Sequence, residues 1–289
     1  RLSFDGRLIK LKTMKKTYKL PVLSLIIIGL FLYGSIFGQE KSPLIVIKSI
    51  PSPTNSTNDL TFDGTYLYVG GYDFAIFKIL PSGVIIDTLI TPVKRPYGLT
   101  IVNGKLWVAN NINKTIHRIN KVTGASEKSF PSPCTTYDAG LAWDGSYLWH
   151  TDAQMQKLYK LDTTGVVKQT LITPLQEPTG LSFDGTYLWI GDNFTNKLYK
   201  YNPNTFKYID TIDSPKGRPN GLAFDGQYLW VGENESPIGA DTLFLIDIGA
   251  PPSSINTQNN DLQISVLPNP SSGLFKFFLK GNVEKVEIS

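Results

Sequence analysis

A repeat of about 40 residues is the feature that most constrains how this chain can fold. Nearly the same sequence recurs five times, over residues 59–80, 98–120, 140–162, 180–202 and 221–247. A fixed period filled with short apolar alternations is typical of one supersecondary unit repeated around an axis. The turn glycines of the five units lie 40, 41, 40 and 41 residues apart and are Gly64, Gly104, Gly145, Gly185 and Gly226.

Each repeat divides into four predicted strands, as the fourth repeat shows most clearly. Its first strand is followed by Asp184-Gly185, a two-residue hairpin signal, and then by a second strand of alternating polarity. The four strands, called a to d in chain order, are predicted at 181–183, 187–190, 198–201 and 208–212. The sequence therefore predicts an all-β fold, a five-bladed β-propeller of four-stranded antiparallel blades over residues 39–250.

The fifth repeat lacks a fourth strand, and a segment before the first repeat can supply it. The fifth repeat ends after Leu243–Ile248, shortly before Pro251-Pro252, while Leu44–Ile50 has the pattern of an isolated fourth strand. If these two segments pair, the N-terminal strand closes the ring and no edge strand is left exposed at the junction. A sixth blade would need a further repeat, which the sequence does not contain.

Two residue types recur at fixed places, and both are assigned to the fold. An aspartate precedes the turn glycine in four repeats, and Asn103 takes its place in the second. Because both types favour tight turns and Asn cannot act as a charged ligand, the series is interpreted as turn chemistry and not as a metal ring. The aromatic residues of the second strands, such as Trp149 and Trp189, keep one register and are interpreted as packing between blades.

The N-terminal region is predicted to be a leader. Residues 1–13 precede the first Met and are interpreted as upstream read-through. Residues 14–38 hold a basic start, an apolar run of 18 residues (20–37) and Gly38-Gln39 as a cleavage point, which is typical of a secretory signal peptide. The alternative is a membrane anchor, for which 18 residues is near the lower limit. Pro21 and Gly29 dilute the run, so cleavage is favoured, with no stable membrane span afterwards.

Charge and cysteine content exclude two classes of interpretation. The leader holds seven of the 28 basic residues and one of the 24 acidic ones, so residues 39–289 have 21 basic against 23 acidic residues. The mature chain therefore has no basic surplus with which to bind nucleic acid. Its one cysteine, Cys134, cannot form an internal disulfide, so a secreted domain of this kind must rely on a large apolar core.

Ligand binding is predicted on the loops between strands b and c and between strand d and the next strand a, where the repeats differ most. Variable loops on a rigid scaffold commonly carry function. The fifth repeat also has the longest of the b–c loops. The residues predicted to bind a ligand there are Tyr72, Asn110, Asp152, Asp192, Asn220 and Glu233, and no catalytic residue is assigned.

The polar residues at the ends of the second strands have two interpretations, a calcium site and local capping of the loops. Asn110, Asp152, Asp192 and Glu233 each stand three residues after an aromatic, and converging oxygens of this kind would suit Ca²⁺. Short polar side chains at loop starts also bond to nearby backbone amides, and strand b ends away from the ring axis. Local capping is therefore preferred, and no cofactor is expected. The two histidines have no Ser or Cys partner at a recognisable spacing, which leaves nucleophilic catalysis without support.

The repeat core GLxFDGxYLWxxD, followed by a KLYK strand, resembles the NHL and gluconolactonase-type propeller repeats over about residues 44–248. In the gluconolactonase-like enzymes a central divalent metal is held partly by Asn or Asp just before a Gly-Leu pair. The five matching positions here include Asn58 and Asn220. Five-bladed glutaminyl cyclases share the blade count, but their Glu-Gly-Leu element is absent. Repeats of this type serve unrelated functions, so the resemblance implies an architecture.

A second resemblance lies after a linker at residues 251–260. The segment Leu267-Pro268-Asn269-Pro270, with Ser272-Gly273 and alternating apolar residues behind it, resembles the start of the C-terminal sorting domain of type IX secretion substrates. Residues 261–289 would then be a partial sorting domain, a small β domain that engages the type IX secretion machinery. The resemblance implies a protein secreted by, or attached to the outer-membrane surface of, a Bacteroidetes-type bacterium. An ordinary small β domain is the alternative.

Three functions remain open from the sequence. The favoured one is a non-catalytic extracellular binding module that docks a glycan, a peptide or a surface component. The second is a gluconolactonase-like hydrolase or lyase with a divalent cation in the central channel, and the third is a passive spacer. An enzyme should line its channel with convergent carboxylates, whereas a binding module should expose an aromatic or charged patch at its rim.

Overall fold

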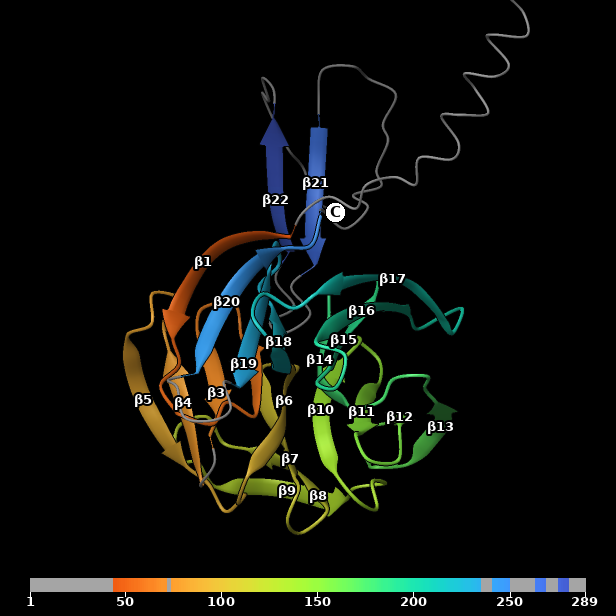
Figure 1. Ribbon diagram of the computed structural model, residues 1–289. Helices are drawn as coiled ribbons and strands as arrows, with labels where there is room; N and C mark the ends of the chain where they lie inside the picture. The colour runs from red at the N-terminus through yellow and green to blue at the C-terminus, as the bar shows by residue number, and fades with distance from the viewer. Residues whose placement is uncertain (1–43, 72–73, 235–240, 250–262, 269–274, 281–289) are drawn as a thin grey trace, which may run out of the picture. The chain divides into compact units, whose positions relative to one another are not determined.

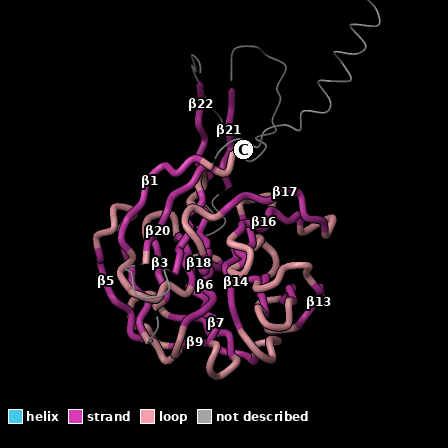
Figure 2. Tube along the Cα trace, viewed as in Figure 1, coloured by secondary structure: helices cyan, strands magenta, loops and turns pink. Residues whose placement is uncertain are grey.

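The computed structural model describes residues 44–71, 74–234, 241–249, 263–268 and 275–280, and these residues form strands and loops without a helix (Figure 2). The predicted five blades are present as five four-stranded sheets. Blade 1 is β2 (Asp59–Phe62), β3 (Leu67–Gly70), β4 (Ala75–Ile79) and β5 (Ile85–Ile90). Blade 2 is β6 (Pro96–Val102), β7 (Lys105–Asn110), β8 (Thr115–Ile119) and β9 (Ser126–Pro131). Blade 3 is β10 (Asp138–Trp143), β11 (Leu148–Asp152), β12 (Lys157–Leu161) and β13 (Val167–Ile172).

Blade 4 is β14 (Pro178–Phe183), β15 (Leu188–Asp192), β16 (Lys197–Asn202) and β17 (Lys207–Asp213). Blade 5 is β18 (Arg218–Phe224), β19 (Leu229–Asn234), β20 (Thr242–Asp247) and β1 (Ile45–Pro51). The innermost strands contact one another in the order β2, β6, β10, β14, β18 and back to β2, which makes a closed ring. We call the end of this ring that carries the b–c and d–a loops the loop face, and the other end the turn face.

The predicted closure by the N-terminal strand is confirmed. β1 runs antiparallel to β20, with Ser49 opposite Phe244 and Ile50 opposite Leu243 (Figure 1). Ile50 is buried in an apolar cluster that also contains Leu60 of blade 1. The first strand of the chain and the last repeat therefore build one blade together, and the ends of the propeller are held by hydrogen bonds.

The turn face follows the predicted turn chemistry. In four blades, Oδ1 of the turn aspartate accepts the backbone N–H groups two and three residues later, as Asp184 does from Thr186 at 2.9 Å and Tyr187 at 2.7 Å. The second carboxylate oxygen of Asp184 accepts the indole N–H of Trp189 at 2.8 Å. In the second blade, Asn103 and Gly104 both have positive φ, at 48° and 75°, as the tightest hairpin turn requires. The aspartate series is thus a set of turns, and in blades 1, 3 and 4 the same aspartate also bonds to the strand-b aromatic.

The core lies between the blades, where the recurrent aromatics pack as predicted. Trp149, Trp189 and Trp230 are among the largest fully buried side chains of the described residues. On strand c a lysine stands opposite the aromatic in several blades, and the ammonium of Lys200 lies 4.4 Å and 5.4 Å from the ring centres of Tyr187 and Trp189. Aliphatic stems of lysine cover the aromatic edge while the charge stays at the surface.

Two further findings concern the rest of the described chain. Strands β21 (Gln263–Pro268) and β22 (Phe275–Lys280) form a separate antiparallel hairpin, with Pro268 opposite Phe275. None of the described residues lies in a helix of the length and apolarity that crossing a membrane would demand. The predicted leader, residues 1–38, lies outside the described residues.

Candidate functional site

Four of the predicted binding residues lie at the ends of the strand-b segments, on the loop face, and all four are buried. They are Asn110, Asp152, Asp192 and Glu233. The first three are the last residue of their strand b, and Glu233 is the last but one. Each one bonds within its own blade. Among the described residues the three carboxylates, Asp152, Asp192 and Glu233, do not come together as a group that could hold a metal ion.

Asp152 and Asp192 each tie two loops of one blade together. The carboxylate of Asp152 accepts the hydroxyl of Thr136 at 2.7 Å, the N–H of Thr135 at 3.1 Å and, from the b–c loop, the N–H of Met155 at 3.0 Å. These bonds hold the pKa of Asp152 below its ordinary value, although burial opposes the charge. In blade 4, Asp192 makes the same pattern through Gln176 at 2.9 Å and Phe194 at 2.9 Å. The carboxylates are thus loop caps, as the sequence interpretation preferred.

Asn110 and Glu233 each make half of this pattern. Asn110 Oδ1 accepts the N–H groups of Ile112 and Asn113 at 3.0 and 3.3 Å, within the b–c loop. Glu233 Oε1 accepts the hydroxyl of Ser214 at 2.6 Å and the N–H of Lys216 at 2.8 Å, in the d–a loop. The longer Glu side chain reaches the d–a loop, whereas the shorter Asn stays on the loop that it begins.

Of the other two predicted binding residues, Asn220 lies among the described residues and Tyr72 does not. Asn220 is half-buried near the start of β18 and links three blades, because its Nδ2 donates to Thr57 O at 3.0 Å and its Oδ1 accepts from Asn193. Asn58, the other matching amide, donates through Nδ2 to Gly71 O at 2.6 Å. Both amides are therefore engaged with backbone or neighbouring side chains. Tyr72 lies outside the described residues.

The b–c loops expose a series of large apolar side chains that the sequence interpretation missed. In each of blades 1 to 4 one such residue stands two to four positions after the residue that ends strand b. The exposed fractions are 42% for Phe74, 47% for Ile112, 42% for Met155 and 67% for Phe194. The signal was present in the sequence, since four successive repeats each place a large apolar residue five or six positions after the strand-b aromatic, in an otherwise mainly polar loop.

The ring axis carries a second unexpected feature. In four blades, a glycine begins the conserved Gly-Leu pair of strand a, but blade 1 has Asp59 there. Its carboxylate is fully buried and accepts the N–H groups of Leu60 at 2.8 Å, Leu222 at 3.2 Å and Leu99 at 2.7 Å. Three blades thus share one carboxyl group. Burial raises the pKa of Asp59 well above its ordinary value, while these N–H bonds oppose the shift.

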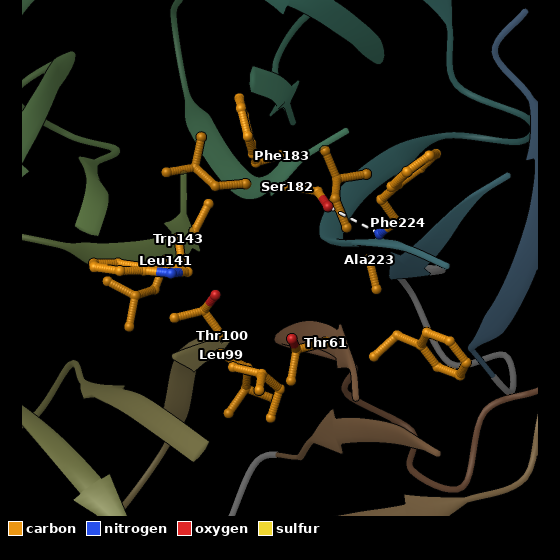
Figure 3. Close-up of a pocket in the computed structure, with 14 residues that line it drawn as sticks. Thr61, Leu99, Thr100, Leu141, Trp143, Ser182, Phe183, Ala223 and Phe224 are labelled. Carbon is orange, nitrogen blue, oxygen red and sulfur yellow. Dashed lines mark hydrogen bonds between the residues drawn. The ribbon is translucent and has the colours of Figure 1, made fainter. Parts of the chain in front are cut away.

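Beyond Asp59, the innermost strands enclose a small central channel (Figure 3). One residue of strand a faces the channel in each blade. Three of these five residues carry a hydroxyl group, and the other two are alanines. A cavity of about 40 Å³ has room for a few waters at most. The residues at this position are Thr61, Thr100, Ala142, Ser182 and Ala223. Large apolar residues such as Trp143 and Phe183 follow.

This lining does not fit the divalent metal that the gluconolactonase resemblance implies. The residues that line the channel include no carboxylate and no side-chain amide. Hard divalent cations need six or more oxygen donors, of which carboxylates supply the charge. Asp59 is the nearest carboxyl group along strand a, but backbone N–H groups already occupy both of its oxygens. No reaction step can be derived through a metal in the described channel.

One histidine has neighbours that the spacing in the sequence did not reveal. The interpretation left His150 without a Ser or Cys partner, but the fold brings Ser132, Cys134 and Asp138 to it. His150 Nε2 lies 2.8 Å from Asp138 Oδ1 and 3.2 Å from Ser132 Oγ. The other histidine, His117, bonds to the hydroxyls of Thr115 and Ser126 at 2.8 and 2.9 Å.

Comparison with known proteins supports the fold. No protein-family model and no curated protein matches the sequence. The glutaminyl cyclase of Myxococcus xanthus is similar in structure at a TM-score of 0.59 and 13% identity, over 71% of this chain and 96% of that one. Virginiamycin B lyase from Staphylococcus aureus (TM-score 0.46, 18% identity, 69% and 83% covered) and the WD40 propeller of Doa1 (0.48, 13%, 67% and 64%) also align. The first likeness establishes a propeller fold, at an identity too low to transfer an activity.

Proposed function

We propose that this chain is a non-catalytic binding module that docks another protein through its loop face. The observation that carries the proposal is the series of exposed apolar residues on the b–c loops: Phe74, Ile112, Met155 and Phe194. Exposed apolar side chains that gather on one face of a soluble domain mark interaction surfaces. Here the four residues occupy equivalent loops of four successive blades.

The chemistry of these residues favours a protein over a glycan. Aromatic residues and methionine are enriched at the centres of protein–protein interfaces. A sugar ring packs best on a flat aromatic face, which Ile112 and Met155 do not provide. The partner class is therefore a polypeptide with an apolar surface, such as a surface protein or an extended peptide.

The caps below the exposed residues add to this capacity. Asp152 and Asp192 bond to backbone N–H groups of both loops of their blades, and Asn110 bonds within its own b–c loop. A loop held in one conformation loses little entropy when a partner binds. The polar residues that the sequence predicted as direct ligands thus act in this proposal as supports for the apolar residues that touch the partner.

The alternative, a gluconolactonase-like hydrolase or lyase, finds less support. It needs a cation in the central channel, and the described channel offers hydroxyls and methyls around a cavity of about 40 Å³. Pockets that bind small molecules usually measure about 300 Å³ or more, so this cavity is several-fold too small for a substrate such as a sugar lactone. We therefore assign no catalytic residue.

The test of the docking proposal places a photo-reactive amino acid at Phe194 and, as the matched control, at Phe206 in the c–d turn of the same blade. Both side chains are exposed, at 67% and 44%, but they lie at opposite ends of the ring. We expect saturable cross-links to a defined cell-envelope protein from position 194 alone. The changes Phe194→Ser and Met155→Ser should remove the cross-link without lowering the melting temperature. Equal labelling from position 206, or binding confined to a glycan array, would contradict the proposal.

For export, we propose the type IX route to the cell surface or medium. Support comes from the Leu267–Pro270 sequence and from the β21–β22 hairpin, in which Leu267 and Pro268 end β21. Removing residues 261–289 from the native gene should leave a folded propeller in the periplasm, detected by fractionation and protease resistance. Normal appearance of that shortened protein in the medium would contradict this route.

A further inference from the structure

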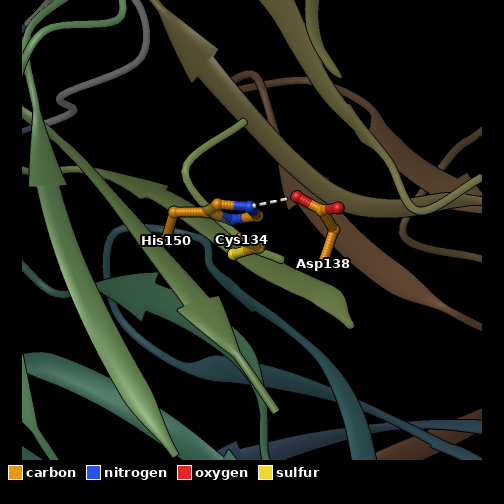
Figure 4. A group of neighbouring side chains, drawn as sticks. All are labelled: Cys134, Asp138 and His150. Atoms are coloured by element: carbon orange, nitrogen blue, oxygen red, sulfur yellow. Dashed lines mark hydrogen bonds and ion pairs between the residues drawn. The ribbon is translucent and has the colours of Figure 1, made fainter. Parts of the chain in front are cut away.

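Blade 3 contains a buried cluster of three side chains whose atoms can all bind a transition metal. Cys134 lies in the loop between β9 and β10, Asp138 begins β10, and His150 is in the middle of β11 (Figure 4). Their exposed fractions are 2%, 0% and 0%. One sulfur, one carboxylate oxygen and one imidazole nitrogen lie within 4.8 Å of one another. Neither the docking surface nor the channel uses these groups.

Blades 2 and 4, the neighbours of blade 3, show which residues the fold accepts at the same three positions. His150 of strand b is opposite Leu141 of strand a in the β10–β11 ladder. The strand-b residue at the same place is Val108 in blade 2 and Ile190 in blade 4. Asp138 is opposite the last residue of strand b, where blades 2 and 4 have Pro96 and Pro178.

The loop position of Cys134 follows a Ser/Thr-Pro pair that recurs in every blade. Blade 2 has Val93 there and blade 4 has Leu175, whereas blades 1 and 5 have Thr54 and Lys216. Compared with its two neighbours, blades 2 and 4, blade 3 has a thiol, a carboxyl group and an imidazole in place of three apolar residues. Placing polar and charged groups in a core lowers stability unless they are paired or bind an ion. The folded blade does not need this exchange, since its neighbours are built without it.

The surroundings orient the three groups toward one point. His150 Nδ1–H donates to the carbonyl of Gly140 at 2.9 Å, which leaves Nε2 facing Asp138. Metal-binding histidines usually have a carbonyl or carboxylate on their second nitrogen in this way. Asp138 directs Oδ1 to His150 and Oδ2 to the Lys114 ammonium at 3.3 Å. Lys114 is itself held by Asn111 Oδ1 and Thr136 O, at 2.9 and 2.6 Å.

We propose that Cys134, Asp138 and His150 form a structural binding site for a zinc-class divalent cation. Ser132 Oγ, 3.2 Å from His150 Nε2, or a water would complete a four-coordinate shell. A ligand set of one sulfur, one nitrogen and one oxygen suits Zn²⁺, which prefers Cys and His and closed tetrahedral sites. It does not suit Ca²⁺ or Mg²⁺, which prefer oxygen ligands throughout.

Binding of a divalent cation at these three side chains requires the thiolate form of Cys134 and a free Nε2 on His150, so protons leave as the metal enters and the affinity should rise with pH.

The inference is tested on the full chain, purified without a histidine tag. We expect elemental analysis to find one zinc per chain, and titration of metal-free protein against a chromophoric chelator to give a dissociation constant below about 1 µM, the range of structural zinc sites. Cobalt substitution should produce thiolate-to-cobalt charge-transfer absorption. The melting temperature of the metal-free protein should rise when zinc is added.

Three variants separate this site from adventitious binding. Cys134→Ser should weaken zinc affinity at least tenfold and remove the charge-transfer band, while His117→Ala should change neither. The triple variant Cys134→Val, Asp138→Pro, His150→Val gives blade 3 the residues of blade 2, so it should fold and bind no zinc. A wild-type chain with neither zinc nor a zinc-dependent melting temperature would overturn the inference, as would unchanged affinity in the triple variant. The docking proposal would be unaffected by either result.

Discussion

At the scale of single residues, this propeller is defined by departures from its own repeat. Asp59 stands where four blades have glycine, and its carboxyl group accepts N–H bonds from strands of blades 1, 2 and 5. Asp63 is a turn aspartate like three others, but it also accepts the ammonium of Lys121 from blade 2 at 2.9 Å. In both places a local position of one repeat has gained a bond to another blade.

The first prediction concerns Asp59→Asn. The amide keeps the shape of the side chain, but its NH₂ group must face at least one of the N–H groups of Leu60, Leu99 and Leu222, which leaves a buried donor without an acceptor. Each such donor costs about 1–3 kcal/mol, so we expect a loss of about 2–4 kcal/mol in the free energy of unfolding. Urea denaturation followed by tryptophan fluorescence measures it.

Asp225→Asn is the matched control for this change. Asp225 makes only the two turn bonds to Gln227 and Tyr228, at 2.9 and 2.8 Å, both to its Oδ1, and the Oδ1 of an asparagine can accept the same two N–H groups. Its cost should stay below about 1 kcal/mol. If the two variants lost the same amount, Asp59 would have no special place in the ring.

The second prediction is a pH dependence that comes from Asp63. Burial opposes its charge, but the Tyr66 N–H and the Lys121 ammonium outweigh this, and the pKa of Asp63 lies below its ordinary value. A depressed pKa stabilises the folded state above the unfolded pKa of about 3.9, and the stabilisation is lost as the pH falls through the folded value. Asp63→Asn should therefore cost about 1 kcal/mol at pH 7, and the cost should shrink as the pH falls below about 3.9.

Thermal unfolding of both proteins from pH 3 to pH 7 measures this difference. Lys121→Met serves as the control, because removing the cation should abolish most of the pH-dependent part while keeping the turn. A gap between wild type and Asp63→Asn that stayed constant with pH would show that the ion pair contributes nothing.

At the scale of the strand, the blades approach so closely that the backbone leaves no room for side chains. A Cβ atom at Gly140 would lie 2.2 Å from Thr179 O and 2.5 Å from Leu181 N of the next blade. Gly98 and Gly180 meet the following blade in the same way, at 2.4 and 2.7 Å from a carbonyl oxygen. The glycine of the repeated Gly-Leu pair is therefore required by the packing of one innermost strand on the next.

The third prediction follows for Gly140→Ala. Backbone atoms on the facing strand cannot move aside as a flexible side chain can, so the blades must separate, and we expect a loss of more than about 3 kcal/mol or failure to fold. Gly217→Ala is the matched control, because a Cβ there meets nothing within 4 Å. It should change stability by less than about 1 kcal/mol. Similar melting temperatures for the two variants would contradict the packing argument.

The repeat made the strands and turns predictable, but not the site. The Asp-Gly and Asn-Gly pairs and the alternating residues act over a few positions, so Trp149 and Asp184 could be placed from local sequence alone. His150 and Cys134 could not be joined, since their contact depends on how the d–a loop folds over strand b. The exposure of Ile112 and Phe194 was not predicted either, because local sequence does not show whether an apolar loop residue packs inward or faces solvent. Differences between the repeats at equivalent positions carry the signal for both groups.

At the scale of the whole molecule, closure decides whether five blades form one domain. The innermost strands contact each other all round, but only blade 5 is assembled from both ends of the propeller, through β1 and β20. Ile50 of β1 packs with Leu60 and Leu67 of blade 1, so the closing strand also covers the junction between the last blade and the first. Stability of the ring should therefore depend on β1, which precedes the first repeat in the sequence but pairs with the last one.

The last prediction is that removing β1 opens the ring. A chain that starts at Pro53 lacks the pairing of Ser49 and Ile50 with β20 and leaves the N–H and C=O groups of β20 exposed at an edge. Exposed edges of this kind pair with other chains. We expect the shortened protein to melt at a lower temperature than a chain starting at Ser42 and to form dimers or larger species in sedimentation experiments. A synthetic peptide of residues 44–53 should restore both properties, because it can supply the missing strand in trans, whereas the same peptide with Ile50→Asp should not, since Ile50 is buried. A monomeric shortened chain with an unchanged melting temperature would mean that the other four blades and three strands hold the ring without its closing strand.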